Sequence, residues 1–413
     1  MITIDPVAHA LIPVDSAAAN ELGAPNYDEF QSDQEVWALL QLRPHSVLRV
    51  TMPHCHVPTA DEIGDEDDPE TLWRATTSMA TLIAEPLTRE VRNILWVYEI
   101  TDPRDPSIRQ IGLGGMGRTR EIRTAENPNG TIIRNEGVRE SKTKGRARLT
   151  EATRTDMGTV NNAVDDASGA FQEALEAHAA ASPPTFETSD ESECRHRVWI
   201  VEDRETIERF RALLANEARA YVADGNHRSA AAAMLGYEHF LTVFFPARTM
   251  HIAPYNRLIQ APAPARAAVL VALGDQFTIE QVEGNAAFQP DRTHEIGMYD
   301  GQRWWKLTPK PGTFDPADAA QDIDADIVQR LIIDRIFGID DARDERLTYV
   351  GANRNAEWLQ EEVDSDRFAY AITLPPVTMR QFIDVCLQDK LMPPKSTWFV
   401  PKIRSGLVMA LLG

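Results

Sequence analysis

Residues 221–235 read Tyr-Val-Ala-Asp-Gly-Asn-His-Arg-Ser-Ala-Ala-Ala-Ala-Met-Leu, and this stretch indicates the fold most directly. Tyr221–Ala223 predicts a buried strand, because it is short and apolar and is followed at once by Asp224-Gly225, which breaks it. Ser229–Leu235 predicts the start of a helix, since alanine, methionine and leucine are strong helix formers. A strand, a glycine free to take positive φ and a helix N-terminus in one tight turn form an anion site, to which His227 and Arg228 add donors. A short turn with incidental polar residues is the alternative.

Strand and helix patterns alternate on both sides of this turn. Ile94–Ile100, Arg197–Val201 and His239–Phe245 are apolar runs that predict strands, and the apolar spacing of Arg204–Ala218 predicts an amphipathic helix. The stretch 179–190, which contains Ser-Pro-Pro, indicates a linker or an exposed loop. The chain as a whole therefore predicts a mixed α+β protein.

Composition limits the classes of function. The chain has 413 residues, enough for two to three domains at about 150 residues each. Its net charge of -21 argues against binding to nucleic acid and to anionic membranes. We find no signal peptide, no apolar run of about 18 residues and only three scattered cysteines, Cys55, Cys194 and Cys386. These features predict a soluble cytoplasmic protein; they leave the oligomeric state open.

Two segments are basic against this acidic background. Residues 134–154 contain seven lysines or arginines and three glutamates, and residues 390–413 contain four basic side chains and no carboxylate side chain. Glu136 lies in the first basic segment, three positions after the apolar pair Ile132-Ile133. Taken alone, Glu136 fits a surface ion pair better than a catalytic base.

Two other motifs favour structural interpretations. Gly112–Gly117 satisfies the G-x-G-x-x-G pattern, but no amphipathic helix follows it, so it predicts a glycine-rich strand rather than a dinucleotide site. His54-Cys55-His56 brings three metal-binding side chains together. Neighbours in an extended segment point to opposite faces, and the spacing matches no standard zinc motif, so we expect a chance cluster near the end of a strand.

The whole chain resembles the family known as domain of unknown function 1015. The resemblance rests on motifs whose order and spacing fit that family, the last of which is long and highly specific: Pro25–Asp28, Arg134–Glu136 with Lys144–Arg146, His196–Trp199, Asp224–Arg228 and Met392–Lys402.

This resemblance implies a ParB/sulfiredoxin-like core, in which a turn of the Asp-Gly-His-His-Arg type holds nucleotide phosphates. A member of that fold with known chemistry is free serine kinase, in which a glutamate upstream of the turn acts as base towards the substrate hydroxyl. The implied parts are an N-terminal α+β region over residues 1–125, a nucleotide-binding core over 126–265 and a C-terminal α/β region over 266–413.

The implied activity is a nucleotide-dependent kinase that phosphorylates serine or a similar hydroxylated amino or organic acid, with ATP or ADP as the phosphoryl donor. Glu136 corresponds to the base that takes the hydroxyl proton, and Asp224 to a ligand of Mg2+ or of a polar substrate group. His227 is the third residue to which the resemblance implies a catalytic role. Phosphoryl transfer requires alignment and charge neutralisation, and the residues expected to supply them are Gly225, Asn226, Arg228, Arg139, Lys144, Arg146, Lys395 and Ser396. A buried structural role is the alternative for Lys395 and Ser396.

The chain departs from the family pattern at three positions, where asparagine replaces histidine: Asn135, Asn226 and Asn256. Asparagine keeps hydrogen bonding but loses the acid-base chemistry of imidazole. A second hypothesis is therefore a nucleotide-binding or regulatory protein without catalysis. DNA binding like that of ParB is a third.

Overall fold

The structure is a computed structural model that describes residues 1–66, 68–138, 140–284, 286–342 and 344–412. The chain forms two compact units. The first contains residues 1–134, 138–250 and 401–413, and the second contains residues 135–137 and 251–400. The expected parts were residues 1–125, 126–265 and 266–413. In the structure a single sheet joins strands from both of the first two parts, and the end of the chain returns to that sheet as a strand. The predicted mixed α/β class is confirmed, while the ParB/sulfiredoxin-like core stays a prediction.

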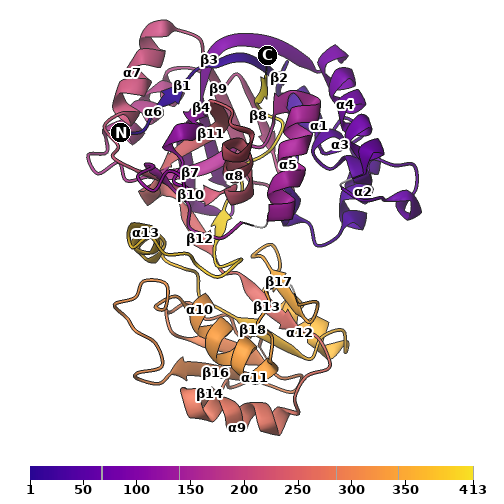
Figure 1. The fold of residues 1–413 in the computed structure, drawn as a ribbon, viewed down its shortest axis with the longest axis vertical. Helices are drawn as coiled ribbons and strands as arrows, with labels where there is room; N and C mark the ends of the chain where they lie inside the picture. Colours follow the sequence, from indigo (N-terminus) through magenta and orange to yellow (C-terminus); the bar gives the residue numbers. More distant parts are fainter. Residues whose placement is uncertain (67, 139, 285, 343, 413) are drawn as a thin grey trace. The chain divides into compact units, whose positions relative to one another are not determined.

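A mixed sheet organises the first unit (Figure 1). Its main path follows the order β5-β10-β7-β11-β4-β3-β2-β20-β6, with β1 paired to β4 and with β9 between β3 and β8. The pairs β5-β10 and β7-β11 are parallel. The strands are β1 (Ile4–Asp5), β2 (Val7–Pro13), β3 (Thr88–Asp102), β4 (Asp105–Arg118), β5 (Ile132–Ile133), β6 (Thr155–Asp156), β7 (Val160–Val164), β8 (Phe186–Ser189), β9 (Arg195–Val201), β10 (Ala220–Asp224), β11 (His239–Pro246) and β20 (Met409–Leu411).

The strand predictions are confirmed, and so is the glycine-rich strand. Ile94–Ile100 lies in β3, Arg197–Val201 in β9 and His239–Phe245 in β11, while Gly112–Gly117 lies in β4. Gly114 faces Trp96 across the β3-β4 pair, and a Cβ there would overlap the indole ring. The glycines of β4 therefore make room for large neighbours.

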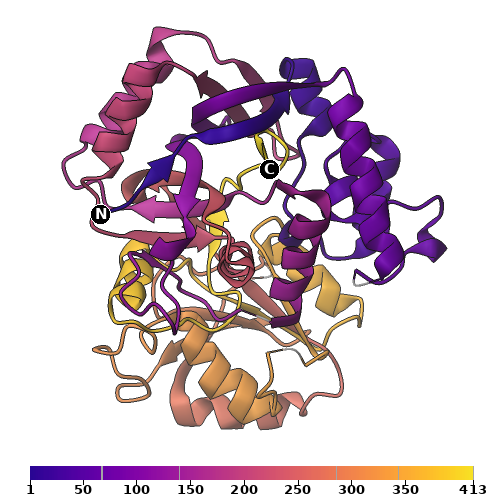
Figure 2. The ribbon, with the colours of Figure 1, turned by 45° about the horizontal axis from the view of Figure 1, so that its top comes forward.

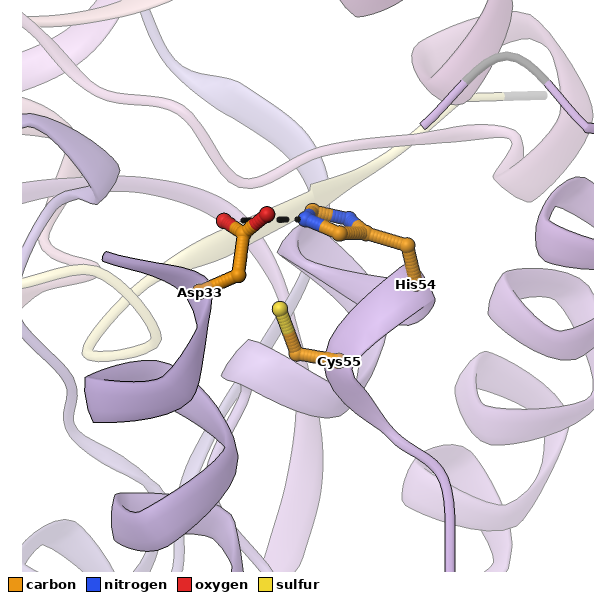
Figure 3. A group of neighbouring side chains, drawn as sticks. All are labelled: Asp33, His54 and Cys55. Atoms are coloured by element: carbon orange, nitrogen blue, oxygen red, sulfur yellow. Dashed lines mark ion pairs between the residues drawn. The ribbon is translucent and has the colours of Figure 1, made fainter. Parts of the chain in front are cut away.

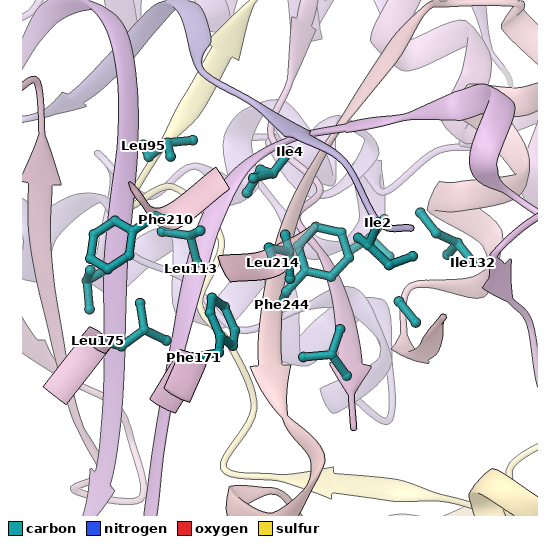
Figure 4. Close-up of a cluster of buried hydrophobic side chains, with 14 of the residues drawn as sticks. Ile2, Ile4, Leu95, Leu113, Ile132, Phe171, Leu175, Phe210, Leu214 and Phe244 are labelled. Atoms are coloured by element: carbon teal, nitrogen blue, oxygen red, sulfur yellow. The ribbon is translucent and has the colours of Figure 1, made fainter. Parts of the chain in front are cut away.

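Helices cover this sheet and pack beside it. They are α1 (Ser16–Leu22), α2 (Asp33–Leu42), α3 (Leu48–Thr51), α4 (Pro69–Ala84), α5 (Glu140–Thr153), α6 (Ala170–Ala181), α7 (Arg204–Leu214) and α8 (Asn226–Leu235). Figure 4 shows Phe171, Leu175, Phe210 and Leu214 of α6 and α7 packed in one core with sheet residues such as Phe244. A second core lies among α1 to α4 and includes Cys55.

Two boundary predictions are wrong. The helix expected over Arg204–Ala218 ends at Leu214, because residues 215–219 turn the chain into β10. The stretch 179–190 is not simply a linker. It contains the end of α6 and all of β8, whose short polar sequence pairs with β9.

The second unit has a six-stranded antiparallel sheet in the order β14-β16-β15-β18-β13-β17 and a separate pair, β12-β19. Its strands are β12 (His251–Ala253), β13 (Asn256–Ile259), β14 (Phe277–Gln281), β15 (Ile296–Tyr299), β16 (Trp304–Pro309), β17 (Leu347–Val350), β18 (Tyr370–Thr373) and β19 (Trp398–Val400). Its helices are α9 (Arg266–Gln276), α10 (Asp324–Val328), a π-helical turn Gln329–Asp334, α11 (Arg335–Phe337), α12 (Ala356–Asp364) and α13 (Met379–Leu387). Among the described residues, no helix combines the length and the apolar character needed to cross a bilayer.

Candidate functional site

The turn after β10 has the conformation that the sequence predicts. β10 ends at Asp224, Gly225 has φ 97° and ψ 28°, and α8 begins at Asn226, three residues before the predicted start. Glycine adopts this left-handed conformation without the strain that a Cβ would add. Gly225 has no side chain to cap α8, and the first N–H groups of a helix have no acceptor within the helix. Together with the helix dipole they favour an anion at this turn.

Arg228 folds back beside the turn and connects distant segments of the first unit. Its Nη1 donates to the Thr159 carbonyl oxygen at 2.6 Å and to Asn26 Oδ1 at 3.3 Å. Asn26 also accepts from Ser405 Oγ at 3.0 Å, so the turn, the N-terminal motif and the last residues of the chain meet here. Gly158 makes this possible, because a Cβ at that position would lie 2.7 Å from Arg228 Cδ.

Asp224 is neutralised by two cations. Arg228 Nη2 lies 3.4 Å from Asp224 Oδ1, and Lys402 Nζ lies 3.2 Å from Asp224 Oδ2. Arg228 and Lys402 are both largely buried, which strengthens their interaction with the carboxylate. The three groups together carry one positive charge. The group that was expected to bind Mg2+ therefore has a cation on each oxygen.

A pocket of about 800 Å3, including its open side, lies in the first unit next to Arg228. Its wall is formed by one face of α8, by α5 and by the segments around residues 25–27 and 155–158. α5 and α8 pack side by side, as Figures 1 and 2 show. The polar lining includes Asn26, Tyr27, Arg146, Asp156 and Arg228, while the rest of the α8 lining is apolar and consists of Ala231, Ala232 and Leu235. Such a mixture of apolar wall and few polar groups is typical of a small-molecule site.

Asp156 is a pocket residue that the sequence analysis missed. Its Oδ2 accepts from the Leu241 N–H at 2.8 Å and its Oδ1 from the Gly158 N–H at 3.2 Å. Burial raises the pKa of Asp156 to about 6, although these hydrogen bonds and the charge of Arg228 act in the opposite direction. A carboxyl group with a raised pKa in a pocket is a candidate functional group. No local pattern marks it, because Leu241 lies 85 positions away.

The first basic segment reaches the pocket through one arginine. Arg146 Nη1 donates to the Thr51 carbonyl oxygen at 2.9 Å, and its guanidinium lies 4.4 Å from the centre of the Tyr27 ring. Lys144 instead forms an exposed ion pair with Glu140 at 2.6 Å, four residues earlier on α5. Arg139 lies outside the described residues. The structure thus brings Arg146 and Arg228 together at the pocket, and Lys144 is not part of its lining.

Glu136 belongs to the second unit. It forms an isolated parallel bridge with Met392, and the Met392 N–H donates to the Asn135 carbonyl oxygen at 2.9 Å. This places the half-buried Glu136 beside the start of the Met392–Lys402 motif. Ser396 is buried and donates to the Pro393 carbonyl oxygen at 2.7 Å, which stabilises a local turn. Lys395 has φ 59°, and its Nζ lies 5.3 Å from the centre of the Tyr255 ring.

Arg257 is a second buried arginine, and only 1% of it is exposed. Its Nη1 donates to the Tyr255 carbonyl oxygen, its Nη2 to the Lys395 carbonyl oxygen at 3.1 Å, and its guanidinium lies over the Tyr349 ring. Burial lowers the pKa of Arg257 to about 10, and the charge of Glu136 acts in the opposite direction. The second unit therefore brings Glu136, Arg257 and Lys395 together.

The three asparagines that replace histidines of the family pattern have different environments. Asn256 accepts from the Leu374 N–H and donates to Gln289 Oε1, both at 3.0 Å, so its side chain connects strands and loops. Asn135 is buried beside the Met392 bridge, and Asn226 is the first residue of α8. His227 follows it and is half-buried.

Comparisons with known proteins identify the family. Residues 4–331 match the family described as "Protein of unknown function (DUF1015)". Similar solved structures include a conserved hypothetical protein from Pyrococcus furiosus, with 12% identity, a TM-score of 0.37, and coverage of 67% of this chain and 92% of that chain. They also include free serine kinase in complex with AMP, with 11% identity, a TM-score of 0.39, and coverage of 67% and 89%.

A third similar structure is SbnI with C-terminal truncation from Staphylococcus aureus, with 11% identity, a TM-score of 0.37, and coverage of 67% and 82%. Among curated proteins no match was found. The family match spans more than three quarters of the sequence. The chain therefore belongs to the DUF1015 family of proteins of unknown function.

Proposed function

We propose that this protein is a nucleotide-dependent phosphotransferase whose first unit binds nucleotide phosphates at the Asp224–Arg228 turn. The observation that carries the proposal is the turn itself: a left-handed glycine, an uncapped helix N-terminus and a fixed, largely buried arginine beside a pocket. Backbone N–H groups and guanidinium donors are the groups that bind phosphate oxygens.

The local charge supports the same proposal. The pocket and the turn have three cations, Arg146, Arg228 and Lys402, against two carboxylates, Asp156 and Asp224. Because the pKa of Asp156 is raised to about 6, its negative charge is lost in mild acid. The site is therefore positive in a chain with a net charge of -21, and it suits a small enclosed phosphate rather than a long polyanion.

The phosphoryl donor in this proposal is ATP or ADP, and the acceptor is the hydroxyl of serine or a similar small acid. The hydroxyl oxygen attacks the terminal phosphorus, the bond from phosphorus to the leaving nucleotide oxygen breaks, and Glu136 takes the hydroxyl proton. The assignment of Glu136 rests on the family resemblance. The arginines stabilise the charge of the transferred group.

Asp224 does not fit the expected role as a Mg2+ ligand. Mg2+ prefers one or two carboxylates that remain available beside substrate phosphates, whereas Asp224 is paired with Arg228 and Lys402. Within the described residues, Asp224 belongs to no cluster of three metal-binding side chains. We therefore assign charge neutralisation to the side-chain cations.

The second candidate function is nucleotide binding without catalysis. Asn256 favours it, because both ends of its side-chain amide make structural hydrogen bonds, to Leu374 and to Gln289. The full-length chain should be incubated with ATP or ADP and a set of hydroxylated amino and organic acids, and products detected by mass spectrometry. A phosphorylated acid supports the phosphotransferase. Saturable nucleotide binding without any product supports the second candidate, and no nucleotide binding contradicts both.

A further inference from the structure

A group of metal-binding side chains lies in the first unit, away from the turn after β10. Asp33 is the first residue of α2, and His54 and Cys55 lie in the 3-10 turn Pro53–Cys55. One ligand atom from each of the three lies within 4.8 Å of the other two (Figure 3). The sequence analysis expected a chance cluster near the end of a strand. The location is wrong, because the segment is a tight turn and not the end of a strand, and the third partner in space, Asp33, comes from another helix.

His54 has an unusual environment for a histidine. It is 1% exposed, and neither ring nitrogen has a hydrogen-bond partner within the described part of the chain. The closest charged contact is a long one, 3.4 Å from Nε2 to Asp33 Oδ1. A buried imidazole without hydrogen bonds is costly, and an ion is one of the few partners that would compensate for it.

Cys55 and its surroundings fit a cation. The thiol is fully buried, and the negative charges of Asp33 and Glu66 both act on it. His54 and Glu66 line the same small pocket, to which Arg146 also contributes. The two carboxylates that act on the thiol favour a cation over an anion there, and the guanidinium of Arg146 in the same small pocket opposes them in part.

The surrounding structure holds the group in place. Trp37 Nε1 donates to the Val57 carbonyl oxygen at 3.1 Å, which ties α2 to the segment after the turn. Arg74 Nη1 donates to the Pro53 carbonyl oxygen at 3.2 Å, which ties the turn to α4. His56, the third member of the sequence cluster, points elsewhere, with its Nδ1 3.3 Å from Ser78 Oγ.

We propose that Asp33, His54 and Cys55 form a zinc site, with the fourth position facing the small pocket that contains Glu66. Thiolate, imidazole and carboxylate are the ligands of tetrahedral zinc, and a hard cation such as Ca2+ or Mg2+ would not select sulfur and nitrogen. Metal–ligand bonds of about 2.0 to 2.3 Å require the ligand atoms to approach one another slightly. Asp33 is half-exposed and free to make that adjustment. Cys55 releases its thiol proton to solvent when the bond to zinc forms.

The test uses the full-length chain, freed of metal with a chelator and titrated with Co2+ and then Zn2+. We expect one Co2+ per chain with a thiolate-to-cobalt charge-transfer band, and displacement of Co2+ by Zn2+. Cys55→Ser should abolish the band, and His54→Gln should weaken binding by about tenfold or more. Cys194→Ser and His56→Gln are matched controls that should keep full binding.

A wild-type protein without the band, or a band that persists in Cys55→Ser, overturns the proposal. If Cys55→Ser does not fold, Asp33→Asn provides the test, because replacing a half-exposed side chain should leave the fold intact. Weaker Co2+ binding with unchanged near-ultraviolet circular dichroism supports the site, and unchanged Co2+ binding overturns it.

Discussion

Arg228 in the first unit and Arg257 in the second are both largely buried, and their charges are compensated in different ways. Arg228 contacts the carboxylate of Asp224 at 3.4 Å and lines a pocket. Arg257 donates to two backbone carbonyl oxygens and lies over Tyr349, and the charge of Glu136 acts on it. Arg228 also donates to the Thr159 carbonyl oxygen, but it lies at a pocket where it can meet a ligand, whereas Arg257 is enclosed by backbone oxygens and a ring and mainly holds the fold together.

The proposed function assigns different roles to residues of the two units. Hydrogen-bond donors for phosphate lie at the turn after β10 in the first unit, and the proposed base, Glu136, lies in the second unit. If this assignment is correct, substitutions in the first unit should change affinity, whereas those in the second should change turnover or stability. The predictions below test this separation.

The largest effect is expected for Glu136→Gln. Loss of a general base should lower turnover by about two to four powers of ten and leave nucleotide affinity nearly unchanged. Steady-state kinetics and calorimetry measure the two quantities. Glu140→Gln, an exposed substitution at the start of α5, is the control and should keep full turnover. Equal turnover in Glu136→Gln and wild type would remove Glu136 from the mechanism.

Arg257→Met should lower the free energy of unfolding by about 3 kcal/mol, because the carbonyl oxygens of Tyr255 and Lys395 would be left buried without donors. Urea unfolding followed by circular dichroism measures this change. Arg380→Met is the matched control in the same unit, since its side chain is 92% exposed. A variant as stable as wild type would contradict the structural role of Arg257.

Arg228→Gln should weaken ADP binding by about 10- to 100-fold, because a charge-assisted donor to phosphate is lost. Its effect on stability should be smaller than that of Arg257→Met, since Lys402 still compensates Asp224. Calorimetric titration with ADP measures the affinity. Lys144→Gln should bind ADP like wild type, because Lys144 pairs with Glu140 outside the pocket lining. Equal ADP affinity in both variants would contradict the proposed site.

The smallest effect concerns pH. Asp156 is neutral below its raised pKa of about 6 and negative above it, so an anion in the pocket should bind more weakly as pH rises through that value. Sulfate is a suitable probe, because it does not titrate in this range. We expect its affinity to fall about three- to tenfold between about pH 5 and about pH 7.

Asp156→Asn should remove that pH dependence. The variant therefore shows that the dependence comes from Asp156 and not from His239, which lines the same pocket. The same shift has a consequence for stability. Because the pKa is higher in the folded than in the unfolded chain, the contribution of Asp156 to stability declines as pH rises from about 4 to about 6 and is constant above that. Sulfate affinity that is independent of pH in wild type would contradict the placement of the anion beside Asp156.

Local patterns were sufficient to predict the strands β3, β4, β9, β10 and β11 and the central turn. Tyr221–Ala223, Asp224 and Gly225 act within a few residues of one another, so their sequence determines their conformation. The glycines of β4 were separated from a dinucleotide motif because no helix follows them. The short strand β8 could not be predicted, because its polar residues are stabilised by pairing with β9.

The pocket depends on contacts that no local pattern reveals. Asp156 acquires its raised pKa from burial between Gly158 and the distant Leu241, and Arg146 reaches the pocket because α5 packs against α8. Lys144, only two positions away, points outward because of the helical period. Asp33 and His54 likewise meet only in the folded chain.

Hydrogen exchange of the full-length chain with and without ADP tests the central claim most directly, because it locates the bound phosphates. The proposed site predicts slower exchange of the amides at the start of α8, from Asn226 to Ser229, and in α5 around Arg146, with both effects requiring about 10- to 100-fold more ADP in Arg228→Gln. Saturating ADP that leaves the exchange of α8 and α5 unchanged would contradict the account.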